Sequence, residues 1–88
     1  MNNVINADLG EKTVLKVNMP AEGNLNIAVL TIDGNIITYL NKGKLSEGEH
    51  WFTWNGKNRS GNSVARGMYF IRVSGSGIDE TRKVMVVK

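Results

Sequence analysis

The sequence contains no cysteine and only one histidine, and these two scarcities remove most kinds of chemistry. Without cysteine the chain can form no disulfide, no thiolate nucleophile and no thiolate metal site. His50 has no second histidine or cysteine with which to build a metal centre or a catalytic pair. We therefore expect no metal and no other cofactor, and we interpret the chain as non-catalytic.

Long apolar runs and concentrated positive charge are also missing. No stretch approaches the ~20 apolar residues of a membrane helix, so we expect no membrane span. The net charge of +3 comes from 11 basic and 8 acidic residues, and Arg82-Lys83 is the one adjacent basic pair. A nucleic-acid-binding surface gathers Lys and Arg with aromatic side chains, because its affinity comes from neutralising successive phosphates. We therefore expect no nucleic-acid partner.

The length and glycine content are those of one small domain. A chain of 88 residues with 41% apolar and 22% charged residues has room for one modest core, and 10 glycines indicate many turns. The start, Met1 to Asn3, has neither the basic nor the apolar part of a signal peptide. Because the last predicted strand ends the chain at Lys88, we interpret residues 1–88 as the C-terminal module of a longer protein.

Apolar side chains recur with a period of two, which is the period of β-strands. We expect strands over 13–19, 25–32, 35–40, 50–54, 67–73 and 81–87, with a short edge strand near Val4 and Ile5. Asp33-Gly34 is the strongest hairpin signal and predicts a type I′ turn with positive φ at both residues. Six or seven short strands without a helix of ordinary length predict an all-β fold, a small antiparallel β-sandwich.

The stretch from Trp54 to Tyr69 holds three closely spaced turn signals between two of these strands. They are Asn55-Gly56, Ser60-Gly61-Asn62 and Arg66-Gly67. Turn residues in this arrangement predict a structural corner. Gly67 is expected either to take a backbone conformation that disfavours side chains or to lie where Tyr69 packs closely against a loop. Tyr69 resembles the tyrosine corner of other sandwiches, whose hydroxyl bonds to the backbone.

The order and spacing of these motifs resemble one known family. The quoted residues are Val17-Asn18-Met19-Pro20-Ala21-Glu22-Gly23, Asp33-Gly34, Gly48-x-His50-x-Phe52-x-Trp54-Asn55-Gly56 and Gly61-Asn62-x-Val64-x-x-Gly67-x-Tyr69. Over residues 13–88 they are similar to the immunoglobulin-like domain first known from the flagellar hook-capping protein, which also occurs as a C-terminal module of exported bacterial proteins. That family usually has Asp at the position of Asn55. Because Asn keeps a short side-chain acceptor that can close an Asx turn, we expect the turn to survive.

The end of the chain resembles a second family. Gly67-Met68-Tyr69-Phe70 and the run from Arg82 to Lys88 are similar to the C-terminal sorting domains of type IX secretion cargo, although the proline- and asparagine-rich opening of that family is absent. Together the resemblances imply an extracellular or cell-surface module that serves in sorting, in attachment to the cell surface or as a structural spacer. Its partners would be the secretion and sorting machinery or the other domains of the parent protein.

Three residues are candidates for partner contact: Trp51, Lys83 and Lys88. Trp51 and Trp54 lie on opposite faces of one predicted strand, so they cannot form a single sugar-stacking platform, and we expect Trp54 in the core. Trp51, if exposed, could contact polysaccharide or protein. Lys83 and Lys88 flank an expected edge strand, where they either deter aggregation or are recognised by a translocation machine.

These residues leave alternatives to the sorting or spacer module. One is a carbohydrate- or protein-binding module of a secreted enzyme, which would recognise a protein partner by strand addition along an exposed edge. The other is a scaffold domain for hook assembly, which the first resemblance implies.

Overall fold

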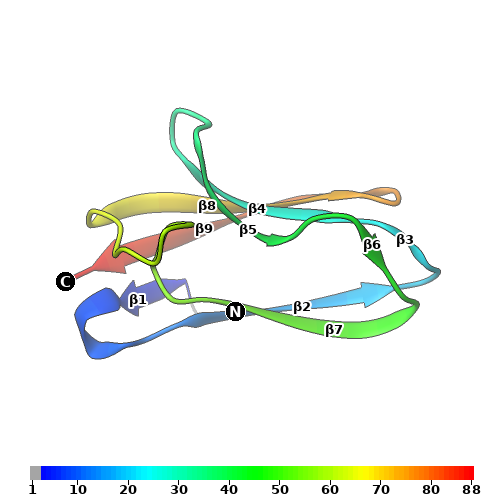
Figure 1. The fold of residues 1–88 in the computed structure, drawn as a ribbon, viewed down its shortest axis with the longest axis horizontal. Helices are drawn as coiled ribbons and strands as arrows, with labels where there is room; N and C mark the ends of the chain where they lie inside the picture. The colour runs from blue at the N-terminus through cyan, green and yellow to red at the C-terminus, as the bar shows by residue number, and fades with distance from the viewer. Residues whose placement is uncertain (1–2) are drawn as a thin grey trace.

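The structure, a computed structural model, describes residues 3–88, which form nine strands and one short 3-10 helix (Figure 1). The elements are β1 (Val4–Asn6), η1 (Ala7–Leu9), β2 (Thr13–Met19), β3 (Gly23–Asn24), β4 (Asn26–Thr31), β5 (Ile36–Asn41), β6 (Lys44–Leu45), β7 (Gly48–Trp54), β8 (Gly67–Gly75) and β9 (Ile78–Val87). Seven of these strands have three or more residues, which confirms the all-β prediction. Within residues 3–88, no helix is long and apolar enough to cross a membrane.

The strands form two layers that face each other across the core. One layer is a five-stranded sheet in the order β1-β9-β8-β4-β5, and the other is the two-stranded sheet β2-β7 (Figure 1). The short pair β3-β6 lies between them at one end of the molecule. The pairs are antiparallel, as predicted, except that β1 runs parallel to β9.

A single turn of helix moves the chain from one layer to the other. The side-chain oxygen of Asn6 accepts hydrogen bonds from the backbone N–H groups of Asp8 and Leu9 and so caps η1. Gly10 ends the helix in the left-handed conformation, with φ 70°. The cap and the glycine together turn the chain from β1, beside β9, to β2 in the opposite layer.

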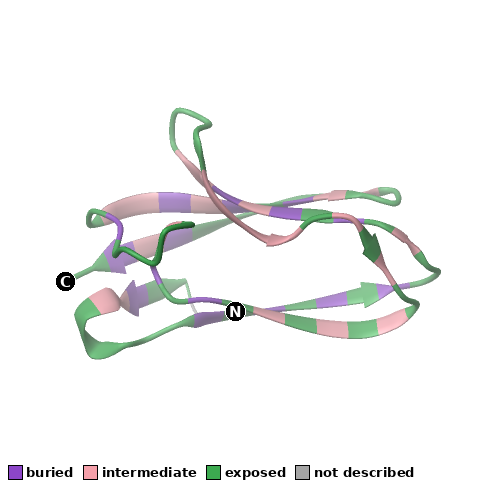
Figure 2. Cartoon of the chain, in the orientation of Figure 1, coloured by how far each residue is buried: buried purple, intermediate pink, exposed green. Residues whose placement is uncertain are grey.

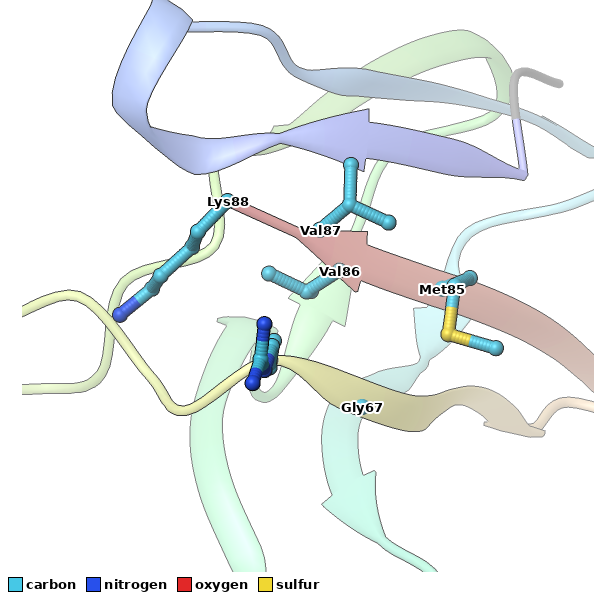
Figure 3. A pocket seen from close by; sticks show the side chains of 6 residues that line it. Gly67, Met85, Val86, Val87 and Lys88 are labelled. Carbon is cyan, nitrogen blue, oxygen red and sulfur yellow. The ribbon is translucent and has the colours of Figure 1, made fainter.

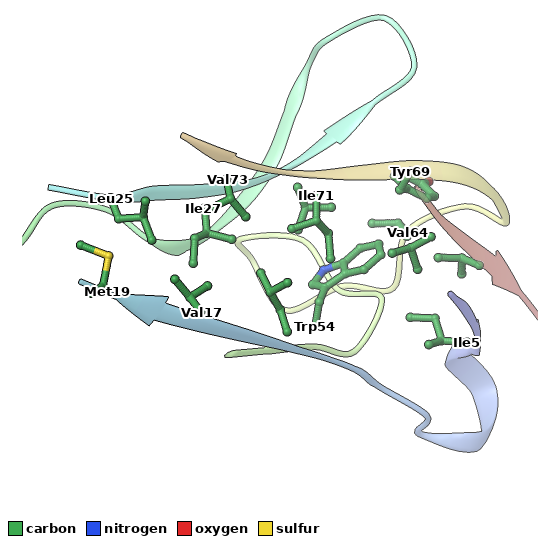
Figure 4. Close-up of a cluster of buried hydrophobic side chains, with 14 residues drawn as sticks. Ile5, Val17, Met19, Leu25, Ile27, Trp54, Val64, Tyr69, Ile71 and Val73 are labelled. Carbon is green, nitrogen blue, oxygen red and sulfur yellow. The ribbon is translucent and has the colours of Figure 1, made fainter. Parts of the chain in front are cut away.

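The core lies between the layers because side chains alternate along every long strand. In β2 each alternate residue from Thr13 to Met19 is buried, and the residues between them are exposed (Figure 2). Figure 4 shows Val17 and Met19 of β2 facing side chains of β4 and β8, and Val84 and Val86 of β9 belong to the same core. The buried apolar residues are Ile5, Leu15, Val17, Met19, Leu25, Ile27, Val29, Trp54, Val64, Tyr69, Ile71, Val73, Val84 and Val86.

The prediction of a type I′ turn at Asp33-Gly34 is wrong. The Gly34 N–H bonds to Thr31 O at 3.0 Å and the Thr31 N–H to Asn35 O at 2.9 Å, which makes a three-residue loop. Gly34 has φ 86°, whereas Asp33 does not have a positive φ. A turn followed by one left-handed glycine is the usual form of a three-residue hairpin loop, and it leaves a bulge in the strand pair. Register shifts between β4 and β5 agree with this.

The two-residue turn with positive φ at both residues lies instead at Ser76-Gly77. Their φ angles are 49° and 79°, and the flanking residues Gly75 and Ile78 are paired. The Ser76 hydroxyl donates a hydrogen bond of 2.8 Å to the carbonyl of Asn24, which anchors the turn. This tight turn lets β9 start at Ile78, before the predicted start of the last strand at residue 81.

The sequence predicted that the last strand lies at the edge of its sheet, and this is only partly correct. β1 pairs with the end of β9, so that Val4, Ile5 and Asn6 lie opposite Met85, Val86 and Val87. The prediction failed because the pairing joins the two ends of the chain, which local sequence patterns do not report. The first part of β9, residues 78–84, still has no strand on its outer side within the described part of the chain.

Candidate functional site

The corner between β7 and β8 is built around two aromatic side chains. Trp54 ends β7 with its ring in the core, where 2% of the residue is exposed, and its Nε1–H donates to the Lys57 carbonyl at 2.9 Å. Tyr69 lies in β8, and its hydroxyl donates to the Ala65 carbonyl at 2.7 Å. The two ring centroids are 5.5 Å apart (Figure 4). Both rings therefore fasten the loop 55–66 to the sandwich.

Gly56 is required in this corner for two separate reasons. Its φ of 78° disfavours any side chain, and a Cβ at this position would lie 3.3 Å from Cβ of Ala7 and 3.6 Å from Cδ1 of Ile5. Its carbonyl accepts the Val64 N–H at 2.9 Å, which closes the loop. The corner thus packs directly against β1 and η1 at the other end of the chain.

An Asx turn organises the tip of the corner, and it is made by Asn58. The Asn58 Oδ1 accepts the backbone N–H groups of Ser60 and Asn62, both at 3.0 Å. Gly61 has φ 83° and its N–H bonds to Asn58 O at 3.0 Å. Among residues 3–88, the side chain of Asn55 makes no hydrogen bond, so the expected Asx turn lies three residues further along the chain.

The end of the corner has a backbone conformation that suits glycine, and it buries a phenol. Gly67 has φ 148°, a conformation that side chains rarely adopt, and among residues 3–88 no atom beyond its two chain neighbours lies within 4 Å of where its Cβ would be. The first of the two expected reasons for a glycine therefore holds, and the second, close packing, does not. Burial raises the pKa of the Tyr69 hydroxyl above its ordinary value, because the charged form would lose its hydration.

Trp51 lies on the outer face of the two-stranded sheet, opposite to Trp54. It is 61% exposed, and the Lys16 ammonium lies over its ring, 5.5 Å from the ring centroid. The same Lys16 Nζ lies 3.1 Å from a carboxylate oxygen of Glu49. The Trp51 ring is thus partly covered by Lys16, which also forms an ion pair with Glu49, and it lies apart from the corner.

Lys83 lies within β9, whereas Lys88 follows its last residue. Lys88 lines a shallow groove of about 300 Å³ together with Gly67 and Val86 (Figure 3). Lys83 is exposed in the part of β9 that β1 does not cover. The structure does not bring Trp51, Lys83 and Lys88 into one surface, since Trp51 belongs to the other sheet.

Arg82-Lys83 stands out in the sequence as a basic pair, but Asp79 and Glu80 just before it were not predicted to belong to a contact surface. Glu80 and Arg82 line a second groove, of about 360 Å³, with Lys16 and Asn18 of β2. The signal was present in the sequence as Asp79-Glu80-Thr81-Arg82-Lys83, in which two acidic residues precede a threonine and two basic residues follow it. Within residues 3–88, no three His, Cys, Asp or Glu side chains are grouped so that they could hold a metal ion.

Two packed β-layers joined by a fastened corner define a small immunoglobulin-like sandwich domain. The family model described as "FlgD Ig-like domain" matches residues 2–78, and the chain belongs to this family, the immunoglobulin-like domain of the flagellar hook-capping protein. This confirms the first resemblance read from the sequence.

Individual relatives agree with the family. The basal-body rod modification proteins FlgD of Salmonella typhimurium and Salmonella typhi are each 32% identical over 62 residues, which is 70% of this chain and 26% of the relative. The chain therefore matches about a quarter of the length of these curated relatives. The crystal structure of FLGD from P. aeruginosa superposes with a TM-score of 0.59 at 23% identity, covering 94% of this chain and 62% of the other, and it supports the fold.

Proposed function

We propose that this chain is a non-catalytic scaffold module of a longer exported protein. The observation that carries the proposal is its membership of the FlgD Ig-like domain family, over residues 2–78. The relatives are named basal-body rod modification proteins, and they are about four times as long as the matched region, so such a domain works beside other domains. By this analogy the module takes part in an assembly like that of the flagellar hook, and its partners are the parent's other domains.

The surface supports a non-catalytic role. Three shallow grooves on the described residues have volumes of about 280 to 360 Å³, the lower limit for ligand sites. None of the three brings a hydroxyl group together with a histidine or a carboxylate, the pairing that nucleophilic catalysis uses.

Sorting or attachment at the cell surface is the second candidate, and exposed Lys83 is the observation that favours it. Deletion of residues 81–88 would not test it, because Val84 and Val86 are buried in the core and their loss would unfold the domain. Substitution of the exposed charges leaves the core intact. Lys83→Glu with Lys88→Glu is therefore the informative variant.

The experiment compares three forms of the full-length parent protein: unchanged, Lys83→Glu/Lys88→Glu, and Trp54→Ala. Export, surface display and assembly are measured by fractionation, and folding of the domain by its thermal unfolding. The scaffold proposal predicts that the lysine variant is exported and displayed normally, whereas Trp54→Ala loses assembly together with the fold. A lysine variant that keeps its fold but loses display would overturn the scaffold proposal in favour of sorting.

A polysaccharide-binding role is tested separately at Trp51. The scaffold proposal predicts that Trp51 fluorescence is unchanged across a panel of glycans and that Trp51→Ala assembles normally. Quenching by one polysaccharide that disappears in Trp51→Ala would replace the proposal with a binding module.

A further inference from the structure

Among residues 3–88, the outer edge of β9 has no strand partner along its first part. β1 begins at Val4, opposite Met85, and pairs only with the end of β9, from Met85 to Val87 (Figure 3). The five residues 79–83 are all exposed. An open edge carries unpaired N–H and C=O groups, so it is a template for pairing with another strand.

The geometry of β9 identifies which backbone groups point outward. The Met85 N–H points to the outer side, because it bonds to Asn3 O in front of β1 at 2.7 Å. Pairing of β9 with β8 proceeds without a register shift from Ile78 to Val86, so the outward direction recurs at every second residue. The backbone N–H and C=O groups of Asp79, Thr81 and Lys83 therefore face outward as well.

The side chains along this edge are complementary to themselves. In an antiparallel pair of two copies centred on Thr81, Thr81 lies opposite Thr81 of the second copy. Asp79 then lies opposite Lys83, and Glu80 opposite Arg82, in both directions. Opposite charges placed directly across a strand pair stabilise it, whereas like charges destabilise it.

We propose that the edge of β9 from Asp79 to Lys83 is a docking surface for a second copy of this chain. The outward groups of Asp79, Thr81 and Lys83 would form about six backbone hydrogen bonds with those of the second copy. The two five-stranded sheets would then join across a two-fold axis at Thr81, and each copy would offer the same surface to the other.

The pairing is limited to residues 79–83 by Asn3, which lies on the outer side of β9 with its carbonyl bonded to the Met85 N–H, so Ile78 of each copy must bend away from Asn3 of the other. A groove of about 360 Å³ between β2 and β9 is lined by Lys16, Asn18, Glu80 and Arg82. Asp79 lies 3.5 Å from Arg72 and Glu80 lies 3.6 Å from Arg82, within the same chain. These ion pairs are exposed and contribute little, so exchanging them for contacts with a second copy costs little.

A protective role for the charges makes a different prediction. Edge strands are often guarded by charged side chains that repel a second strand. Guarding works best with charges of one sign, whereas here acidic residues precede Thr81 and basic residues follow it.

The paired edge is short and falls below the ~1,200 Å² of stable interfaces, so association is weak and depends on concentration.

The test measures self-association of the 88-residue chain by sedimentation equilibrium at low salt, from about 10 μM to about 1 mM. The unchanged chain is expected to dimerise within this range. A basic variant, Asp79→Lys/Glu80→Arg, and an acidic variant, Arg82→Glu/Lys83→Asp, each place like charges opposite one another. Each alone should associate at least ~10-fold more weakly, and an equimolar mixture should regain the affinity of the unchanged chain.

Two controls separate the proposed pairing from general effects of charge. The variant with all four substitutions has the original charge composition in reversed order, remains self-complementary and should dimerise like the unchanged chain. Thr81→Pro removes the central outward N–H and should lose association, whereas Thr81→Val keeps it. Far-UV circular dichroism and thermal unfolding check that every variant is folded.

Three results would overturn the proposal. The unchanged chain could stay monomeric at 1 mM, as expected if the edge is guarded or receives a strand of a different protein. The mixture of basic and acidic variants could fail to associate. A dimer could also persist in both charge variants and in Thr81→Pro, which would place the interface elsewhere.

Discussion

The indole ring of Trp54 packs against the phenol ring of Tyr69, with their planes inclined by 60° and their centroids 5.5 Å apart. The rings come from different layers, since Trp54 ends β7 and Tyr69 belongs to β8. Each ring also holds one carbonyl of the intervening loop, at Lys57 and at Ala65. This aromatic pair therefore joins the two sheets and the corner in one contact, and it should dominate the stability of this end of the sandwich.

Removing the indole should destabilise the domain strongly. Trp54→Ala deletes a buried ring and leaves the Lys57 carbonyl without its partner, so we expect a loss of about 3–5 kcal/mol in the free energy of unfolding. Trp51→Ala is the matched control, because it removes the same side chain from an exposed site, and it should cost under about 1 kcal/mol. Urea unfolding followed by circular dichroism measures both. Equal losses at the two positions would contradict the arrangement of the core.

The hydroxyl of Tyr69 should contribute separately from its ring. Tyr69→Phe keeps the contact with Trp54 but removes the hydrogen bond to the Ala65 carbonyl. We expect a loss of about 1–2 kcal/mol, the usual cost of a lost hydrogen bond whose partner stays behind. Tyr39→Phe serves as the control, since Tyr39 lies in β5, outside the buried core. Equal urea midpoints for Tyr69→Phe and the unchanged chain would show that the bond is not needed.

The raised pKa of Tyr69 also predicts how stability depends on alkaline pH. The folded state binds the hydroxyl proton more tightly than the unfolded state, where the pKa has its ordinary value of 10.0. The stabilisation is therefore complete below pH 10 and is lost as pH rises through the folded pKa. Above about pH 10, the free energy of unfolding should fall more steeply in the unchanged chain than in Tyr69→Phe. Parallel pH curves for the two proteins would count against burial of this hydroxyl.

The alternating pattern predicted the core because alternation is a local property of each strand. Val17, Ile71 and Val84 could be assigned to the interior from the period of two alone. The position of β1 beside β9 could not, because it joins residues from opposite ends of the chain. The turn types could not be predicted either, because they depend on how the strands pair. Asp33-Gly34 and Ser76-Gly77 both have glycine second, yet only Ser76-Gly77 has positive φ at both residues.

The corner shows the same division between local and distant causes. The spacing of residues predicted its turns and the roles of its two aromatic residues. It also predicted that Trp51 and Trp54 lie on opposite faces of one strand. The crowding at Gly56 was not predicted, since Ala7 and Ile5 lie about fifty residues earlier in the sequence. Asn55 and Asn58 are chemically identical, and only the path of the loop selects Asn58 as the Asx acceptor.

The two asparagines give a test of that selection. Asn58→Ala removes the acceptor of two backbone N–H groups at the tip of the loop, and we expect a loss of about 1–2 kcal/mol. Asn55→Ala should change stability by under about 0.5 kcal/mol, because its exposed side chain makes no hydrogen bond within the described part of the chain. Thermal unfolding of both variants measures the difference. A larger loss at Asn55 would place the Asx turn where the sequence first suggested it.

Gly67 and Gly75 separate the cost of backbone strain from the cost of crowding. Both have positive φ, 148° and 124°, so each should disfavour a side chain. At Gly67 the space is open, and Gly67→Ala and Gly67→Val should each lose about 1–3 kcal/mol from strain alone. At Gly75 a Cβ would lie 2.5 Å from the Asn24 carbonyl oxygen, so the backbone of a neighbouring segment would have to move.

We therefore expect Gly75→Ala to be more destabilising than Gly67→Ala, by at least about 1 kcal/mol. Chemical unfolding at constant temperature gives both values, with unchanged m-values showing that the unfolded state is the same. An unchanged midpoint for Gly67→Val would show that the corner tolerates a side chain and that its φ is not fixed by the fold. Equal losses at the two glycines would mean that the Asn24 segment moves freely, although the Ser76 hydroxyl holds its carbonyl.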